Sequence, residues 1–161
     1  AIYEDTKFDE YADGADRAGL QVGAYFFSQA ISVAEAEEEA YFVLDKLRGH
    51  NITGPVVFDW EVIGKSEART YGIETGVLCA AAKAFCEIIE DAGYDAMIYI
   101  TDYAGYVKYD LSKVMDYPLW YARYDVSAPT FYYDFDMWQY SSKGSVDGIK
   151  GNVDMDIWFI K

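Results

Sequence analysis

The sequence contains little of what several common functional sites require. Its 161 residues include one histidine, two cysteines and three prolines. The single histidine, His50, gives little support to histidine-based catalytic triads or to histidine-rich metal sites. Cys79 and Cys86 fall in one predicted helix, roughly 10 Å apart along its axis, which is too far for a disulfide. We therefore expect no metal site and two buried, unpaired cysteines.

Long apolar runs and positive charge are also scarce. No apolar run approaches the roughly 20 residues of a membrane span. Thirteen lysines and arginines stand against 28 aspartates and glutamates, which gives a formal net charge of −15. That charge repels phosphates, and the sequence has no glycine-rich nucleotide loop or calcium-binding loop. Neither nucleic acid nor a membrane is therefore an expected partner.

The residues that are present describe a globular chain rich in aromatic side chains. Hydrophobic residues make up 52% and charged residues 25%, so we expect one domain over residues 1–161. Aromatic residues reach 18%, with 16 tyrosines. A core does not need so many tyrosines, because each hydroxyl requires a partner. Clefts that bind sugars use such rings, so this excess weakly favours a glycan-binding surface.

Helical and strand patterns alternate along the chain, which predicts parallel βα units in an α/β fold. After about residue 109 the strands lack long helices between them, so the regular rhythm is expected to end there. Ser32 and Glu35 form a capping box at the start of the second helix, where Glu37, Glu38 and Glu39 are expected to face water. The predicted helices are 6–18, 32–48, 74–92 and 101–108, and the predicted strands are 21–27, 55–59, 95–100, 117–124, 135–140 and 153–159.

The segment PVVFDWE, residues 55–61, carries the most information about function. In a strand, Asp59 and Glu61 point to one side and Trp60 to the other, about 6.6 Å apart along the chain. Two carboxylates at such a separation suit glycoside cleavage, in which one group donates a proton and the other stabilises positive charge. The competing interpretation is a strand that simply emerges into solvent. Function gathers at the carboxyl ends of strands in parallel α/β folds, which favours the catalytic interpretation.

Glu61 is the better proton donor of the pair, because its side chain is longer. A charged Asp59 would raise the pKa of Glu61, while Asp59 itself would stay ionised. Asp154 and Asp156 alternate in the last predicted strand and supply a third carboxylate. Core packing or solvent exposure is the alternative for the remaining candidates, which are the aromatic or amide side chains Tyr25, Phe27, Tyr99, Trp120, Tyr124 and Gln139.

Five segments, taken together and in order, resemble the catalytic domain of glycoside hydrolase family 25, the lysozymes that act as 1,4-β-N-acetylmuramidases. These segments are ADRAGLQVGAYFFS (15–28), PVVFDWE (55–61), LWYARY (119–124), MWQYSS (137–142) and GNVDMDIWF (151–159). The resemblance covers nearly the whole chain. It implies an irregular, flattened (β/α) TIM-like barrel and cleavage of peptidoglycan, with no cofactor.

The resemblance also implies residue roles. Glu61 would be the general acid/base, Asp59 its partner and Asp154 the third acid. Tyr25, Tyr99, Trp120 and Gln139 would contact sugar. The expected setting is outside the producing cell, at a bacterial wall, or inside a phage-infected cell before lysis.

One feature departs from the family pattern. Family members begin with a strand that bears an aspartate, followed by a helix and a second apolar strand, and nothing in this sequence matches them. We therefore expect an N-terminally incomplete barrel, and truncation of a longer chain is the favoured explanation. The alternatives are that another chain supplies the missing strands, or that copies self-associate through the exposed strand edges. The alternative function is that of a degenerate homologue, which binds glycan without cutting it.

Overall fold

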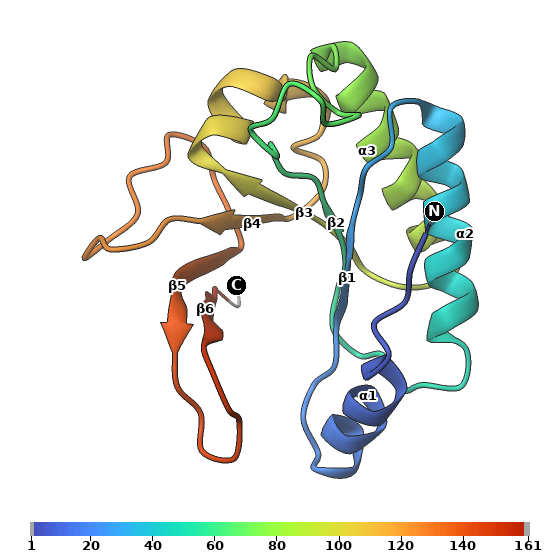
Figure 1. Ribbon diagram of the computed structural model, residues 1–161, viewed down its shortest axis with the longest axis vertical. Coiled ribbons are helices and arrows are strands. Elements are labelled where there is room, and N and C mark those ends of the chain that lie inside the picture. The colour runs from blue at the N-terminus through green and yellow to red at the C-terminus, as the bar shows by residue number, and fades with distance from the viewer. Residues whose placement is uncertain (1, 160–161) are drawn as a thin grey trace.

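A computed structural model of the chain describes residues 2–159. Figure 1 shows one sheet that curls around an open side, with helices on its outer face. The elements are α1 (Phe8–Arg17), β1 (Ala24–Phe27), α2 (Val33–Leu47), β2 (Val56–Asp59), α3 (Thr75–Asp91), β3 (Ala96–Thr101), η1 (Ala104–Lys108), η2 (Leu111–Lys113), β4 (Leu119–Ala122), β5 (Met137–Gly144) and β6 (Val153–Trp158). The predicted strands and the three longer helices are thus confirmed, with β1 and β4 shorter than expected and β5 longer, while the helix predicted over 101–108 is the π-helix η1.

The six strands lie in the sheet in the order in which they occur in the sequence. Strands β1 to β5 pair in parallel, and β6 pairs antiparallel with β5. Only η1 and η2 separate β3 from β4, so the helical rhythm ends where the sequence predicts. The result is a mixed α/β half-barrel. The main core lies on its convex face, so the concave face carries a different set of side chains.

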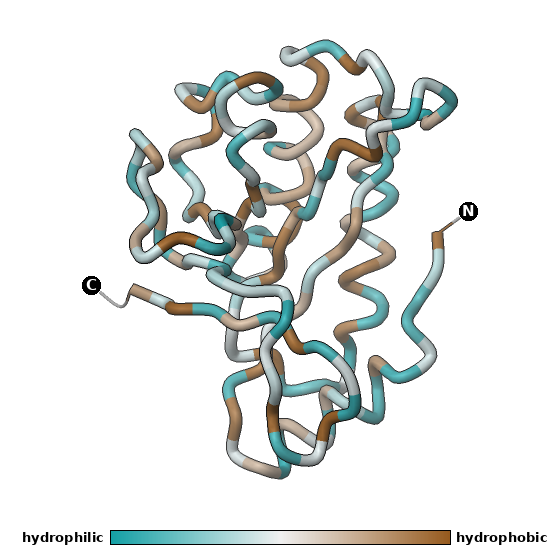
Figure 2. The backbone as a smooth tube through the Cα atoms, turned by 60° about the vertical axis from the view of Figure 1, so that its left-hand side comes forward, coloured by the Kyte–Doolittle hydropathy of each residue, from teal (hydrophilic) through white to brown (hydrophobic). Residues whose placement is uncertain are grey.

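The main hydrophobic core lies between the convex face of the sheet and the helices α2 and α3. Phe58 of β2 and Ile98 of β3 are completely buried there, against Phe85 of α3. Figure 2 shows the central strands as mostly hydrophobic, whereas the helices alternate between hydrophobic and hydrophilic residues. Such alternation is typical of helices that cover one side of a sheet. Cys79 and Cys86 are buried, free thiols in this core, as expected.

The start of α2 differs in two respects from the sequence interpretation. The Ser32 hydroxyl accepts from the Glu35 backbone N–H at 3.3 Å, which is half of the predicted capping box. The Glu35 carboxylate, however, accepts from the Ile31 N–H and pairs with Arg69 instead of returning to Ser32. The prediction that Glu39 faces water is wrong, because its side chain is buried.

His50 has a structural role in joining two helices. Its Nδ1 lies 2.8 Å from Asp13 Oδ1 and its Nε2 lies 3.0 Å from Asp9 Oδ1, so the ring ties the end of α2 to α1. Phe8 packs against the ring edge-on. The hydrogen bond to Asp13, and then that to Asp9, raises the pKa of His50, although partial burial opposes the rise. A ring held by two carboxylates is stabilised in its charged form.

Strands β1 and β6 form the two edges of the sheet. Side chains of β1 alternate between the two faces, and Tyr25 and Phe27 on the concave side are 65% and 44% exposed. Self-association through these edges stays a prediction. None of the helices described in residues 2–159 is long and apolar enough to cross a membrane.

Candidate active site

The acid pair lies at the carboxyl end of β2, at the concave face. Asp59 is the last residue of the strand and is 7% exposed, while Glu61 is partly exposed in the segment that follows. Trp60, between them, is buried in the opposite direction, in the main core. The predicted alternation is therefore present. Asp59 is held on both sides by the parallel ladder, opposite Phe27 of β1 and Tyr99 of β3.

Asp154 reaches the same end of the sheet because the last strand reverses direction. The register pairs Gln139 with Asp156 and Gly144 with Val153, so the beginning of β6 lies beside the carboxyl end of β5. Asp154 is exposed and lies two residues before Asp156. A parallel strand would have carried this acid to the far end of the sheet.

The three acids interact electrostatically. Burial, and after it the charge of Glu61, raises the pKa of Asp59, and burial, followed by the charge of Asp154, raises the pKa of Glu61. The hydroxyl of Tyr25, across the open face on β1, has a pKa raised first by burial and then by Asp59, Asp154 and Glu61 among its neighbours. Acids from β2 and β6 thus share one site with a tyrosine from β1.

The division of protons between the acids differs from the sequence expectation. Burial is the main reason that the pKa of Asp59 rises to about 7, with Glu61 the second cause. Asp59 Oδ1 is buried and has no hydrogen-bond donor among residues 2–159, so nothing there stabilises its charge. Burial, ahead of Asp154, also raises the pKa of Glu61. Burial therefore favours a protonated Asp59 near neutral pH, whereas the sequence interpretation had Asp59 ionised and the proton on Glu61.

A connected group of aromatic and amide side chains covers the concave face beside the acids. The hydroxyl of Tyr99 donates to Gln139 Oε1 at 3.0 Å, and the hydroxyl of Tyr124 donates to the same oxygen at 2.5 Å. Trp120 packs edge-on against Tyr99, with ring centroids 4.9 Å apart. Tyr99 and Gln139 are buried, so they support the surface from below, whereas Trp120 and Tyr124 are partly exposed.

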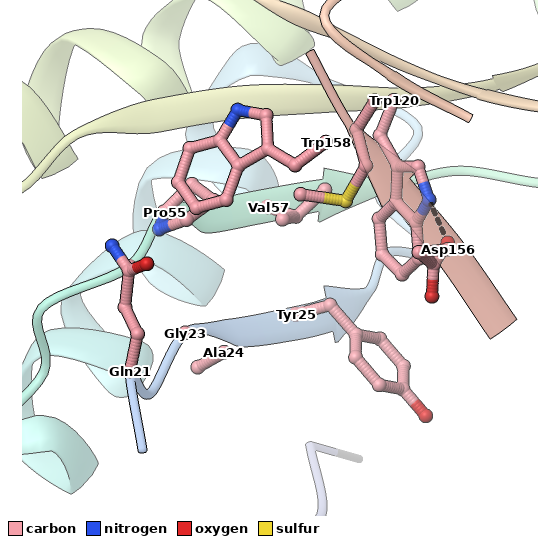
Figure 3. A pocket seen from close by; sticks show the side chains of 11 residues that line it. Gln21, Gly23, Ala24, Tyr25, Pro55, Val57, Trp120, Asp156 and Trp158 are labelled. Atoms are coloured by element: carbon pink, nitrogen blue, oxygen red, sulfur yellow. Dashed lines mark hydrogen bonds between the residues drawn. The ribbon is translucent and has the colours of Figure 1, made fainter. Parts of the chain in front are cut away.

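Asp156 belongs to this group, although no separate role was predicted for it. Its carboxylate accepts from Trp120 Nε1 at 2.7 Å and fixes the indole ring (Figure 3). Burial raises the pKa of Asp156, and Asp154 adds to the rise. The signal was available in the sequence, because Asp154 and Asp156 alternate on one face of the last strand.

A cavity of about 370 Å³ opens on the concave face towards the amino-terminal ends of β1 and β2. Figure 3 shows Tyr25, Trp120 and Trp158 around it, with Asp156 at one end. Asp59 and Glu61 do not line this cavity, so it is an aromatic extension of the concave face and not the place of the acids. Phe27 borders a separate cavity along the free edge of β1, which Tyr25 also lines.

A buried carboxylate on α2 holds the segment that follows β1. Glu39 Oε2 accepts from the Ser28 hydroxyl at 2.6 Å, and Oε1 accepts from the Gln29 N–H at 3.2 Å. The Ser28 N–H donates to the Asp59 carbonyl oxygen at 2.7 Å. Glu39 thereby fixes the chain beside the acid pair. Its position, three residues after buried Ala36 and four before buried Val43, was the sequence signal that it lies on the inner face.

We expect Glu39→Ala to destabilise the fold by about 2–3 kcal/mol, because two buried donors lose their acceptor. Glu39→Gln keeps an acceptor and should recover most of that loss. Thermal and urea unfolding measure both variants. Glu38→Ala, at the exposed neighbour, is the matched control. Equal stability of Glu39→Ala and Glu38→Ala would contradict the proposed role of Glu39 in holding the segment that follows β1.

No group of three or more histidine, cysteine, aspartate or glutamate side chains in residues 2–159 is arranged to hold a metal ion. The groups that this face offers for chemistry are carboxylates, hydroxyls and aromatic rings.

Comparison with known proteins places this arrangement in a family. The family model described as glycosyl hydrolases family 25 matches residues 1–149. The chain is 31% identical over 155 residues to the autolytic lysozyme of Clostridium acetobutylicum, covering 96% of this chain and 44% of that protein. It is 30% identical over 163 residues to lysozyme M1 of Streptomyces globisporus, covering 94% of this chain and 54% of that one. The chain thus spans about half the length of these curated relatives.

Solved structures agree with the sequence matches. A bacterial lysozyme from Streptomyces coelicolor is 26% identical, with a TM-score of 0.78 over 97% of this chain and 75% of that one. A family 25 glycosyl hydrolase from Bacillus anthracis has the same fold, with 19% identity and a TM-score of 0.81 over 99% of this chain and 74% of that one. The curled α/β sheet agrees with these structures, and the family model matches most of the length of the chain. The chain therefore belongs to glycosyl hydrolase family 25.

Proposed function

We propose that the protein containing this chain hydrolyses peptidoglycan as a muramidase, cutting the β-1,4 bond between N-acetylmuramic acid and N-acetylglucosamine with retention of configuration. The observation that carries the proposal is the convergence of Asp59, Glu61 and Asp154 at one end of an aromatic face. Membership of family 25 supports the same reaction.

Glu61 is proposed as the general acid/base. A general acid must hold a proton near neutral pH, and both burial and the charge of Asp154 raise the pKa of Glu61. Its carboxyl protonates the oxygen of the leaving sugar as the glycosidic bond breaks. The resulting carboxylate then takes a proton from the water that attacks the intermediate.

Asp59 is proposed to assist the 2-acetamido group of the sugar, whose carbonyl oxygen attacks the anomeric carbon. The unpartnered Oδ1 of Asp59 suits this role, because an amide N–H of the bound sugar can donate to it. Such a bond favours the ionised form of Asp59. That charge stabilises the positive oxazolinium-like intermediate, and it also favours the protonated form of neighbouring Glu61.

Asp154 is proposed to set the charge of the site and the position of Glu61 from the opposite strand. Tyr25, Phe27, Trp120 and Tyr124 would contact sugar rings, with Tyr99 and Gln139 fixing Tyr124 from below. Aromatic faces suit sugars because the rings cover apolar C–H surfaces while the hydroxyls form hydrogen bonds. The proposed place of action is the bacterial cell wall.

The reaction itself is tested with purified cell walls and the full-length protein. We expect the turbidity to fall and new reducing ends to appear at N-acetylmuramic acid. Proton NMR of the fresh product should show the β-anomer first, since two inversions give retention. An α-anomer first would contradict the proposed course. Binding to walls without any release of reducing ends would instead favour a non-catalytic, glycan-binding protein.

A further inference from the structure

A second cavity, of about 390 Å³, lies on the outer side of the segment that carries Glu61. It is enclosed by the chain that follows β2, including Lys65, Thr70 and Tyr71, and by Tyr103 and Lys108 from the region of η1. Trp60, the residue before Glu61, forms part of its wall. The cavity is therefore adjacent in the chain to Glu61, the proposed acid.

The charge of this cavity is opposite to that of the protein. Acids outnumber basic residues by 28 to 13 in the sequence, yet none of the residues that line the cavity is an aspartate or glutamate. Lys65 and Lys108 both line it, and neither forms an ion pair with any residue in the described part of the chain. Two ammonium groups without an ion pair, in a cavity lined by no carboxylate, attract an anion.

The wall also contains a hydrogen-bond donor without an acceptor. The indole Nε1 of Trp60 is buried and has no partner among residues 2–159. Buried donors are normally satisfied, so one that is not calls for an explanation. The rim is apolar and aromatic, with Val62, Tyr71 and Tyr103 between 43% and 67% exposed.

We propose that this cavity binds a carboxylate of the short acidic peptide that muramic acid carries in peptidoglycan. The inference rests on the proposed function, since it takes the wall polymer as the substrate. The ammonium groups of Lys65 and Lys108 pair with the carboxylate, and the apolar rim covers the small alanine side chains of such a peptide. A peptide on the sugar next to the scissile bond would thereby help to place that bond at Glu61.

The test compares Lys65→Gln/Lys108→Gln with Lys143→Gln in the full-length protein. Lys143 is an exposed lysine of β5 that lines neither cavity, and its change removes the same kind of charge. The probes are peptide-bearing glycan strands and strands from which an amidase has removed the peptides. The double variant loses two exposed ion pairs, so we expect its kcat/KM on peptide-bearing strands to fall by about twofold to thirtyfold. Cleavage of peptide-free strands should not change.

Binding is measured separately from cleavage, so that failure of the two proposals can be told apart. Ligand-observed NMR records the free tetrapeptide, and the same peptide with amidated carboxylates, in the presence of the Glu61→Gln protein at millimolar peptide. We expect lysine-dependent binding that amidation and added salt both weaken. Absence of binding, or binding that ignores the lysines or the amidation, would overturn the assignment of the cavity. If the protein without substitutions failed to cleave the strands although the lysine-dependent binding was present, only the proposed hydrolase activity would be contradicted.

Discussion

Replacing Glu61 by glutamine is expected to abolish the clearing of purified cell walls by the full-length protein. Glutamine keeps the size of the side chain but cannot deliver a proton to the leaving oxygen or take one from water. General acid–base groups typically contribute 10²–10⁴-fold, and Glu61 would act in both steps, so we expect a loss of at least about 1000-fold. The measurement is the initial rate of turbidity decrease, together with the release of reducing ends.

The fold should survive this change, because the Glu61 side chain is partly exposed and glutamine has the same size. Circular dichroism and thermal unfolding check that point. Glu67→Gln is the matched control, since Glu67 lies in the same segment but is exposed to solvent. Clearing at the normal rate by Glu61→Gln would remove this residue from the mechanism.

Asp59→Asn is expected to stabilise the folded protein at pH 8 and to have little effect at pH 4. The pKa of Asp59 is raised from 3.8 to about 7 in the folded state, mainly by burial. Between these values the folded state holds a proton that the unfolded state has lost, so stability decreases as the pH rises through this window. About 3 units of pKa correspond to roughly 4 kcal/mol at pH 8.

The change is measured as the free energy of unfolding from urea titrations between pH 4 and pH 8. The pKa values of Glu61, Glu39 and Asp156 are also raised, so the wild-type protein and the variant should both lose stability with rising pH. The difference between the free energies of unfolding of the two proteins isolates the contribution of Asp59. Asp147→Asn, at an exposed acid, should show no such difference. Parallel curves for wild type and Asp59→Asn would show that the folded protein does not bind this proton.

Local patterns were sufficient to predict the elements of the fold. The period of apolar residues located α2 and α3, and apolar runs bounded by turns located β2 and β3. The least accurate element was the short helix expected over residues 101–108, which is a π-helix over Ala104–Lys108. A single helical turn has too few residues for periodicity to distinguish one hydrogen-bonding pattern from another.

The residues proposed for the candidate site could be named from the sequence, but their pKa shifts could not. Alternation in the strand was enough to pair Asp59 with Glu61, and the resemblance to family 25 added Asp154. The pKa of Asp59 depends on how deeply the chain buries it and on the lack of a donor at Oδ1. Those quantities arise from β1 and β3 on either side of it, and no spacing along the sequence contains them.

The sequence by itself determined which segments are helices and strands, and that acids and rings gather at strand ends, because these follow from periodicities of a few residues. Only the tertiary structure decided that the antiparallel return of β6 brings Asp154 to Glu61 and that Glu39 turns inward to hold Ser28. It alone placed Lys65 and Lys108 around one cavity. These contacts join residues that are 11 to 93 positions apart in the chain, and their energies depend on burial, which is a property of the packed molecule.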